Sequence, residues 1–213
     1  MIVRPKIEEY VASLTPEDPF LERAAAEARA ESLPVVGRTV GRFLEAVVLA
    51  TDARRVLEIG AVNGYAALWL ARSLPDDGGL FSIEIDPRRA AMARAHLEAA
   101  GIGDRAHVIV GDPARMVHKV AGPFDVVFDA GDRGQHGALL DRLVTLLRPG
   151  GVLITGNVLE TAEVAAGLPG SPDRPADEAS AQAAHNRRLA TDPRFVTSFL
   201  PVEDGLALSV KLR

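Results

Sequence analysis

The sequence predicts an α/β fold, with a seven-stranded, mostly parallel sheet that ends in an antiparallel hairpin and helices on both faces. Two observations support this prediction. From residue 55 onward, short β-branched segments alternate with helix-like segments, which is typical of βαβ units on a parallel sheet. The last two apolar segments are separated only by the Glu203-Asp204-Gly205 turn, and a short glycine-containing turn favours an antiparallel pair.

The N-terminal residues 1–50 are expected to form a helical cap. Charged and apolar residues interleave in LERAAAEARAE and GRFLEAVVLA, which predicts amphipathic helices. The α/β core is expected over 55–213. Cap and core should form one domain over 1–213, because a chain of this length can bury a single sizeable core.

Five parallel strands are predicted before the hairpin, at 56–59, 80–85, 107–110, 124–129 and 152–155. After the second strand, the Asp-Pro pair at 86–87 predicts the start of a helix and Gly101 predicts its end. Ala91, Ala95 and Leu97 would form the apolar face of that helix.

A loop is predicted at 167–177, because GLPGSPDRPAD contains two glycines and three prolines. An alanine-rich helix should follow it to about residue 190, ahead of the hairpin strands. Such a loop could act as a lid over a bound acceptor.

Composition excludes several classes of protein. The chain has no cysteine, which excludes a disulfide framework, a thiolate metal site and a cysteine nucleophile. The 24 basic and 29 acidic residues give a net charge of −5, which argues against non-specific binding to the phosphate backbone of nucleic acid. No apolar run is long enough to span a membrane and the first residues do not resemble a signal peptide, so we expect a cytoplasmic protein without a membrane partner.

A glycine turn follows the first predicted strand, in the segment VLEIGAVNGY at 56–65. Glycine permits positive φ and lets a ligand approach the backbone closely. The pattern predicts a site for a nucleoside-type ligand at the carboxyl ends of the strands. The GxGxxG fingerprint is absent, because Val62 stands where the second glycine would be, and this disfavours a dinucleotide.

Acidic residues stand at the ends of the neighbouring strands. Glu84 lies 24 residues after Gly60, where a carboxylate can accept hydrogen bonds from both hydroxyls of a ribose. Glu58 could pair with a cationic group, and Asp129 ends the fourth strand on the same rim. The alternative is a plain tight turn beside a solvated Glu84, but the two features together favour ligand binding.

At this point the chain resembles a known family, the S-adenosylmethionine-dependent O-methyltransferases of the catechol and caffeoyl-CoA type. LEIGAVNGYAALWLA resembles the family's LEIGTxxGYSAL motif, and SIEIDPRRAAMAR and FDVVFDA resemble its second and fourth strands. HNRRLATDPRFVTSFLPVEDGLALSVK is similar to its C-terminal end, and the match runs from about Val36 to Arg213. The resemblance implies a Rossmann-like class I methyltransferase fold.

The resemblance also implies where the cofactor would lie. The methionine part would lie against Gly60 and the Gly64–Ala66 turn, with its amine near Asp129 and Glu58. Glu84 would hold the ribose, and Gly111 to Pro113 would border the adenine. Ala66 stands where the family commonly has serine. The full implied set is Val36, Glu58, Gly60, Gly64, Tyr65, Ala66, Glu84, Ile85, Gly111, Asp112, Pro113 and Asp129.

The family's metal site is altered in this chain. It uses the aspartate that begins a DADK motif and an Asp-Asn pair after the fifth strand, and oxygens of that kind suit magnesium or calcium. Asp129 and Asn157 match two of these positions, but Gly156 replaces the second aspartate. A divalent cation should bind more weakly here unless Asp132 or the substrate supplies an oxygen, so the need for a metal stays open.

The proton acceptor is open as well, because DADK is replaced by Asp129-Ala130-Gly131-Asp132-Arg133. If Gly131 is an insertion, Arg133 aligns with the family's lysine and His136 with its tyrosine. Arginine stays protonated and cannot serve as a base. Asp129, Asp132 and His136 are the catalytic candidates, although His136 is more simply interpreted as a solvated loop residue, and His96 and His118 as residues on helix surfaces.

The leading functional hypothesis is methyl transfer from S-adenosylmethionine to a hydroxyl of a small acceptor, with an aromatic acceptor favoured. One alternative is methylation of a modified tRNA base, for which the pairs at 88–89 and 187–188 could contact phosphates. Another is a cofactor-binding protein with a degraded acceptor site. A nucleotide-dependent oxidoreductase is least favoured. The family usually dimerises, which implies a homodimer with the N-terminal helices as the contact.

Overall fold

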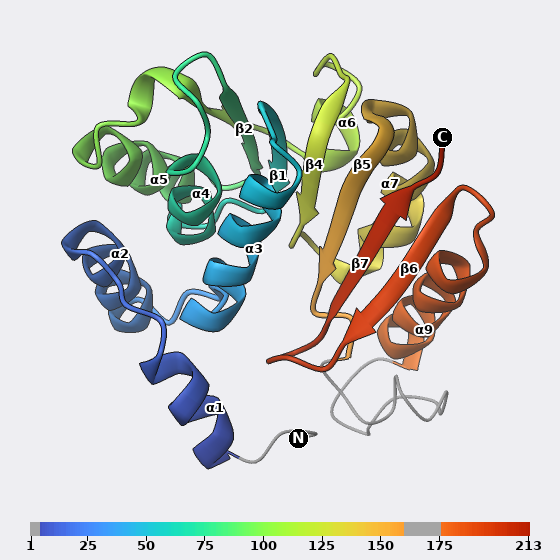
Figure 1. Cartoon of the computed structure of the whole chain (residues 1–213), viewed down its shortest axis with the longest axis horizontal. Helices are drawn as coiled ribbons and strands as arrows, with labels where there is room; N and C mark the ends of the chain where they lie inside the picture. Colours follow the sequence, from blue (N-terminus) through green and yellow to red (C-terminus); the bar gives the residue numbers. More distant parts are fainter. Residues whose placement is uncertain (1–4, 160–175) are drawn as a thin grey trace.

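The computed structural model describes residues 5–159 and 176–213, and its centre is a seven-stranded sheet (Figure 1). The strands are β1 (Arg55–Ile59), β2 (Gly79–Glu84), β3 (Ala106–Val110), β4 (Phe124–Asp129), β5 (Leu147–Gly156), β6 (Phe195–Leu200) and β7 (Leu206–Lys211). Their order is β3-β2-β1-β4-β5-β7-β6. The pairs from β3 to β5 are parallel, whereas β7 is antiparallel to β5 and β6, so the predicted fold with its terminal hairpin is confirmed.

The strand order reverses between β1 and β4, which are neighbours in the sheet but far apart in the chain. Loops that leave the carboxyl ends of such strands diverge and leave a crevice for a ligand. Backbone hydrogen bonds connect the carboxyl ends of neighbouring strands. Gly60 N donates to Ile83 O at 2.9 Å, and Ala130 N donates to Ile59 O at 3.0 Å. Gly60 and Asp129, two of the predicted site residues, therefore lie at the switch point.

Helices cover both faces of the sheet, as Figure 1 shows. One layer contains α2 (Pro19–Ala30), α3 (Arg38–Ala50), α4 (Tyr65–Ala71) and α5 (Pro87–Ala99), and the other α6 (Pro113–Met116), α7 (Arg133–Leu146) and α9 (Ala176–Thr191). Each helix layer packs on one face of the sheet and encloses a hydrophobic core. Successive residues of β1 point to opposite faces, so Val56 packs in the core beside the first layer and Leu57 in the core beside the second. In the described ranges, no helix is long and apolar enough to cross a bilayer.

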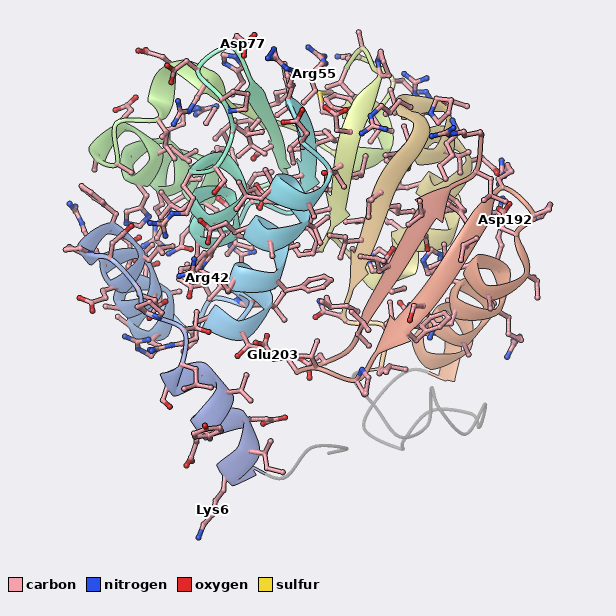
Figure 2. All side chains as sticks on the ribbon, viewed as in Figure 1. Lys6, Arg42, Arg55, Asp77, Asp192 and Glu203 are labelled. Carbon is pink, nitrogen blue, oxygen red and sulfur yellow. The ribbon has the colours of Figure 1, made fainter. Side chains whose placement is uncertain are left out.

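The expected N-terminal cap is present as α1 (Pro5–Ser13), α2 and α3. The start of α2 is capped by the Asp18 carboxylate, which also pairs with Arg72 of α4 at 2.6 Å. The guanidinium groups of Arg42 and Arg72 lie 5.0 and 5.3 Å from the ring of Trp69. Arg42, labelled in Figure 2, belongs to α3, so the cap is fastened to the core through α4.

A close helix contact yields a stability prediction. A Cβ on Gly41 would lie 2.3 Å from the Trp69 Nε1 atom, and Trp69 is fully buried. Gly41→Ala should therefore overpack the contact between α3 and α4 and lower the free energy of unfolding by about 1–3 kcal/mol. Denaturant unfolding measures this. The matched control is Gly137→Ala in α7, where a Cβ meets nothing within 4 Å and better helix propensity should raise stability by up to about 1 kcal/mol.

Two predictions about α5 are wrong. The buried face consists of Ala90, Ala93, His96 and Leu97, whereas Ala91 and Ala95 are exposed. The helix is rotated by about one position relative to the expected stripe, because its contacts with α2, α4 and β3 decide which residues face inward.

His96 is 4% exposed and is not a surface residue. Its Nδ1 lies 2.9 Å from the carbonyl oxygen of Asn63, whose side-chain amide donates to Ala24 O at 2.8 Å. His96 therefore links α5 to the glycine turn and, through Asn63, to α2. His118 is exposed, as expected. The α9 helix begins at Ala176, so residues 176–177, which were predicted to end the loop, belong to the helix, and residues 167–175 lie outside the described residues.

Candidate active site

The turn after β1 requires its two glycines. Gly60 has φ of 87°, and a Cβ there would lie 2.9 Å from the carbonyl oxygen of Ala130. Gly64 has φ of 86°, and its Cβ would lie 2.9 Å from the Cα of Ala93. Between them Val62 adopts φ of 49°, which is strained for a β-branched residue. Strain and close backbone approach at one turn are typical of a ligand site.

Glu84 lies where the sequence predicts the ribose-binding residue, at the carboxyl end of β2. It is 3% exposed, so it is not a solvated strand end. One carboxylate oxygen accepts from Val62 N at 2.8 Å and the other from Asp86 N at 2.9 Å. Each oxygen has a second lone pair, so the carboxylate can also accept from two hydroxyls. Glu84 thus joins the turns after β1 and β2.

Apolar side chains flank Glu84 on the open side. Ile85 is 59% exposed and Val110 is 38% exposed, although both are aliphatic. Gly111 N donates to Glu84 O at 2.9 Å, and the Asp112 carboxylate caps α6 by accepting from Ala114 N. Pro113 is buried behind this turn. Exposed aliphatic groups beside a buried carboxylate form a surface suited to a nucleobase.

Glu58 is fully buried in β1, and the Ser82 hydroxyl donates to it. Burial raises its pKa to about 8, the Ser82 hydrogen bond opposes the shift, and the Glu84 charge adds to it. Its Oε1 atom is buried and has no hydrogen-bond partner among the described residues. A cationic group beside Glu58 would satisfy this oxygen and favour the carboxylate.

This pKa gives a prediction for cofactor binding. An amine placed beside Glu58 should lower the pKa of this carboxyl, so the protein should release a proton when S-adenosylhomocysteine binds at pH 7. The affinity should therefore increase as the pH rises toward 8. Without ligand, Glu58 should make the free energy of unfolding fall as the pH rises from 4.5 to about 8, because in this range only the folded state holds the proton. Calorimetry in buffers of different ionisation enthalpy measures the release. Glu58→Gln should abolish it, and a release unchanged in that variant would contradict the assignment.

Asp129 ends β4 and is 1% exposed. Burial raises its pKa, opposed by nearby His136 and by a hydrogen bond from Gly131 N. The interpretation of His136 as a solvated loop residue is wrong: it is fully buried in α7, with Nε2 3.6 Å from Asp129 Oδ1. Its ring faces that of His185 in α9, with centroids 5.4 Å apart. Burial, with help from His136 and Arg188, lowers the pKa of His185 to about 4, so His185 is neutral.

The other candidate base has a structural role. Asp132 is exposed and caps α7, because its carboxylate accepts from Gly134 N at 2.8 Å. The structure therefore brings Asp129 and His136 together and directs Asp132 to the helix start. His185 was not identified from the sequence, because only the packing of α9 on α7 places it there.

Gly156 is the last residue of β5, and Asn157, which follows it, has φ of 58°. Both line a cavity of about 190 Å³, which is also lined by Ala130, Val36 and Asp204. Within the described ranges, no three acidic or histidine side chains gather closely enough to hold a metal ion. The lining thus includes two of the positions at which the resemblance implies a metal site.

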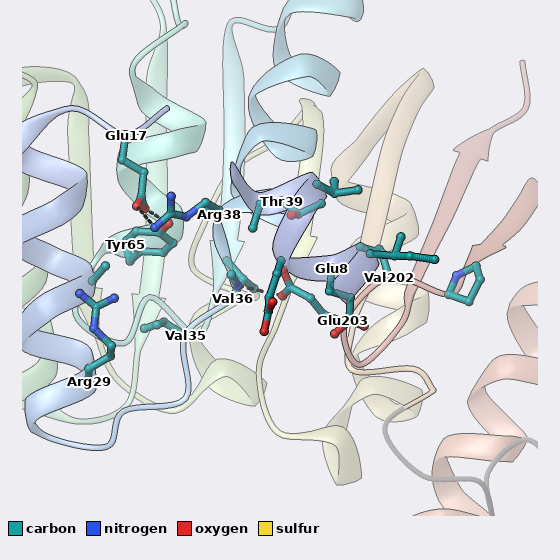
Figure 3. A pocket seen from close by; sticks show the side chains of 17 residues that line it. Glu8, Glu17, Arg29, Val35, Val36, Arg38, Thr39, Tyr65, Val202 and Glu203 are labelled. Atoms are coloured by element: carbon teal, nitrogen blue, oxygen red, sulfur yellow. Dashed lines mark hydrogen bonds and ion pairs between the residues drawn. The ribbon is translucent and has the colours of Figure 1, made fainter. Parts of the chain in front are cut away.

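A second cavity, of about 560 Å³, adjoins the first and is bounded by α1, α2, the start of α3 and the β6–β7 turn (Figure 3). The two share Val35, Val36, Val202 and Glu203 in their walls. Glu203, also labelled in Figure 2, accepts from Gly37 N at 2.8 Å. Apart from Val36, these shared residues could not be identified from the sequence, because residues 35–37 and 202–203 meet only in the fold.

Tyr65 projects into the larger cavity, as Figure 3 shows. Its hydroxyl donates to Glu17, which also pairs with Arg38 at 2.9 Å. Burial and the Glu17 contact raise the pKa of Tyr65, so this phenol stays protonated. Ala66 is buried in the first turn of α4. Of the implied cofactor residues, Val36 and Tyr65 line this cavity.

A sheet of this order, with a glycine turn after β1 and a buried carboxylate at the end of β2, defines a Rossmann-like methyltransferase. Residues 17–212 match the O-methyltransferase family, and the chain belongs to that family. It is an S-adenosylmethionine-dependent methyltransferase.

Individual relatives agree with this assignment. The chain is 36% identical to the catechol O-methyltransferase of Mycobacterium tuberculosis over 159 residues, which cover 73% of this chain and 72% of that protein. It resembles the solved O-methyltransferase of Bacillus cereus in complex with S-adenosylhomocysteine, with a TM-score of 0.86, 30% identity and 97% of each chain covered. The S-adenosylmethionine complex of an O-methyltransferase from Streptomyces achromogenes also has a TM-score of 0.86, at 28% identity, with 98% of this chain and 96% of that chain covered.

Proposed function

We propose that this chain transfers the methyl group of S-adenosylmethionine to a hydroxyl of a small aromatic acceptor. The observation that carries the proposal is the cavity lined by Ala130, Gly156 and Asn157, which lies at the carboxyl ends of the strands beside the glycine turn. The adjoining cavity, of about 560 Å³, offers room for the body of the acceptor.

The residues present fit the cofactor. The lack of a Cβ at Gly60 leaves the backbone open to close approach, and the unpartnered Oε1 of Glu58 can receive the methionine amine. Glu84 would hold the ribose between the two turns that it already joins. Ile85 would cover the adenine beside Gly111, Asp112 and Pro113. Val36, Gly64, Tyr65, Ala66 and Asp129 would border the methionine half. The bound cofactor supplies an electrophilic methyl group on a sulfonium.

The protein's main task is alignment. The walls of the cavity must hold the acceptor oxygen in line with the methyl group and keep water out, which accounts for a large share of the rate in such transfers. Asp129 is the proposed acceptor of the hydroxyl proton, with His136 3.6 Å behind it to stabilise its charge.

A screen for methyl transfer tests the proposal. Phenols, catechols and undermethylated tRNA should each be offered with labelled S-adenosylmethionine, and we expect transfer to a phenolic acceptor alone. Transfer only to tRNA would overturn the proposed acceptor class. Two contacts favour the small acceptor, because Arg88 pairs with Glu31 at 2.8 Å and Arg188 pairs with Asp141 at 2.6 Å. Transfer to none of them, with cofactor binding intact, would favour a degraded acceptor site.

We also propose a homodimer that forms through the N-terminal cap. Ile7, Tyr10 and Val11 of α1 are 50, 64 and 38% exposed, and their spacing places them on one face of the helix. Leu14, just after the helix, is 62% exposed. Light scattering at the concentrations of the assay should give twice the chain mass, and Leu14→Asp should halve it. A monomeric wild type would contradict this proposal. The cytoplasmic location and the single domain over 1–213 remain predictions.

A further inference from the structure

The family resemblance implies a divalent cation at the ends of β4 and β5, held by three side-chain oxygens. This chain offers the Asp129 carboxylate and the Asn157 amide, and Gly156 offers no side chain. A Cβ on Gly156 would lie 3.7 Å from the side chains of Ala130 and Phe128, neither of which bears oxygen. The place of the missing carboxylate is therefore lined by carbon.

Among the described residues, the carboxylates of Asp132 and Glu203 do not replace that missing carboxylate. The Asp132 carboxylate caps α7 through Gly134 N at 2.8 Å, and the Glu203 carboxylate accepts from Gly37 N at 2.8 Å. Asp129 itself accepts from Gly131 N and lies beside His136. Across residues 5–159 and 176–213, no three acidic or histidine side chains are grouped for a metal. One carboxylate and one amide supply one charged ligand fewer than the site that the resemblance implies, so a hard cation that is bound through charged oxygens should bind much more weakly here.

The missing ligand has a consequence for the acceptor. A cation at such a site can bind two neighbouring hydroxyls together, polarise them and lower their pKa. Without the cation, a second hydroxyl beside the reacting one has no metal ion to bind, so it does not add to the affinity for the acceptor. The remaining wall of the smaller cavity includes Val36, Val40 and Val202, which favour an apolar ring face.

We propose that this chain methylates an acceptor through a single hydroxyl and needs no divalent cation, with Gly156 as the residue that decides both. The proposal rests on the proposed function of methyl transfer to an aromatic hydroxyl. In the step, the acceptor oxygen forms a bond to the methyl carbon as the carbon–sulfur bond breaks. That electron pair stays on the sulfur, S-adenosylhomocysteine is left, and the hydroxyl proton leaves to the base assigned above.

Metal binding tests the proposal without reference to activity. Mn²⁺ should be titrated calorimetrically into the wild type, Gly156→Asp and the matched neutral variant Gly156→Asn, each saturated with S-adenosylhomocysteine. Gly156→Asp restores the third ligand, so it should bind Mn²⁺ at least ~10-fold more tightly than the other two. One Mn²⁺ bound by the wild type as tightly as by Gly156→Asp would overturn the proposal. If Gly156→Asp does not fold, the wild-type titration still decides, because stoichiometric binding alone would contradict it.

Rates on matched acceptors give the second readout. A phenol and the catechol that carries one further neighbouring hydroxyl should give wild-type kcat/KM values within about threefold of each other, with or without EDTA. Gly156→Asp with Mg²⁺ should shift this ratio toward the catechol. Loss of wild-type activity in EDTA, or a strong catechol preference that requires Mg²⁺, would overturn the proposal. If no acceptor is methylated, the proposed function is contradicted. The Mn²⁺ titrations then still show whether the wild type binds a divalent cation.

Discussion

Replacing Glu84 by alanine should weaken the binding of S-adenosylhomocysteine by roughly a hundredfold, or about 3 kcal/mol, because two hydrogen bonds from ribose hydroxyls to a charged acceptor are lost. The buried carboxylate is well placed for this role, since its two oxygens already hold Val62 N at 2.8 Å and Asp86 N at 2.9 Å. Calorimetric titration of the variant measures the loss.

Glu84→Ala also removes the hydrogen bonds that join the turns after β1 and β2, so the stability of the variant must be measured separately. Thermal unfolding without ligand should show a moderate loss, because two buried amides lose their acceptor. Glu84→Gln is the matched control, since the glutamine oxygen can still accept one of the bonds and should keep an intermediate affinity. Unchanged affinity in Glu84→Ala would refute the assignment of the ribose to this carboxylate.

Replacing Asp129 by asparagine should lower kcat by roughly 100-fold or more, because an amide of the same size cannot take the acceptor's proton. Single-turnover measurements at saturating cofactor isolate this step from product release. Asp129 is 1% exposed and lies beside His136. Because the carboxylate is shielded from solvent, we do not expect bulk water to take the proton in its place.

Asp132→Asn discriminates between the two candidate carboxylates. Asparagine is as good a helix N-cap as aspartate, so α7 should keep its capped start and the rate should stay close to that of the wild type. A large loss in Asp132→Asn together with a small one in Asp129→Asn would assign the base to Asp132 and contradict our interpretation.

The core and the contact between the glycine turn and Glu84 could largely be predicted from the sequence, because local patterns specify them. Apolar β-branched segments gave all seven strands, and the spacing from Gly60 to Glu84 placed a carboxylate beside the glycine turn. A strand, a turn and the next strand are close in the chain, and short connections leave few alternatives.

The acceptor half could not be predicted in this way, because distant segments build it. His136 is polar and follows a loop, which favours a solvated position, yet packing of α9 buries it against His185. The cavity wall combines residues 35–37 with 202–203, and Glu203 reaches Gly37 across the fold. His96 likewise became buried through contacts with Asn63 that no helical period reveals.

One titration tests the central claim most directly: S-adenosylhomocysteine into the wild-type protein, with and without Mg²⁺. We predict one cofactor bound per chain, with an affinity that is the same in both conditions and a proton released at pH 7. No binding in either condition would contradict the assignment of the crevice around Gly60 and Glu84 as a methyl-donor site.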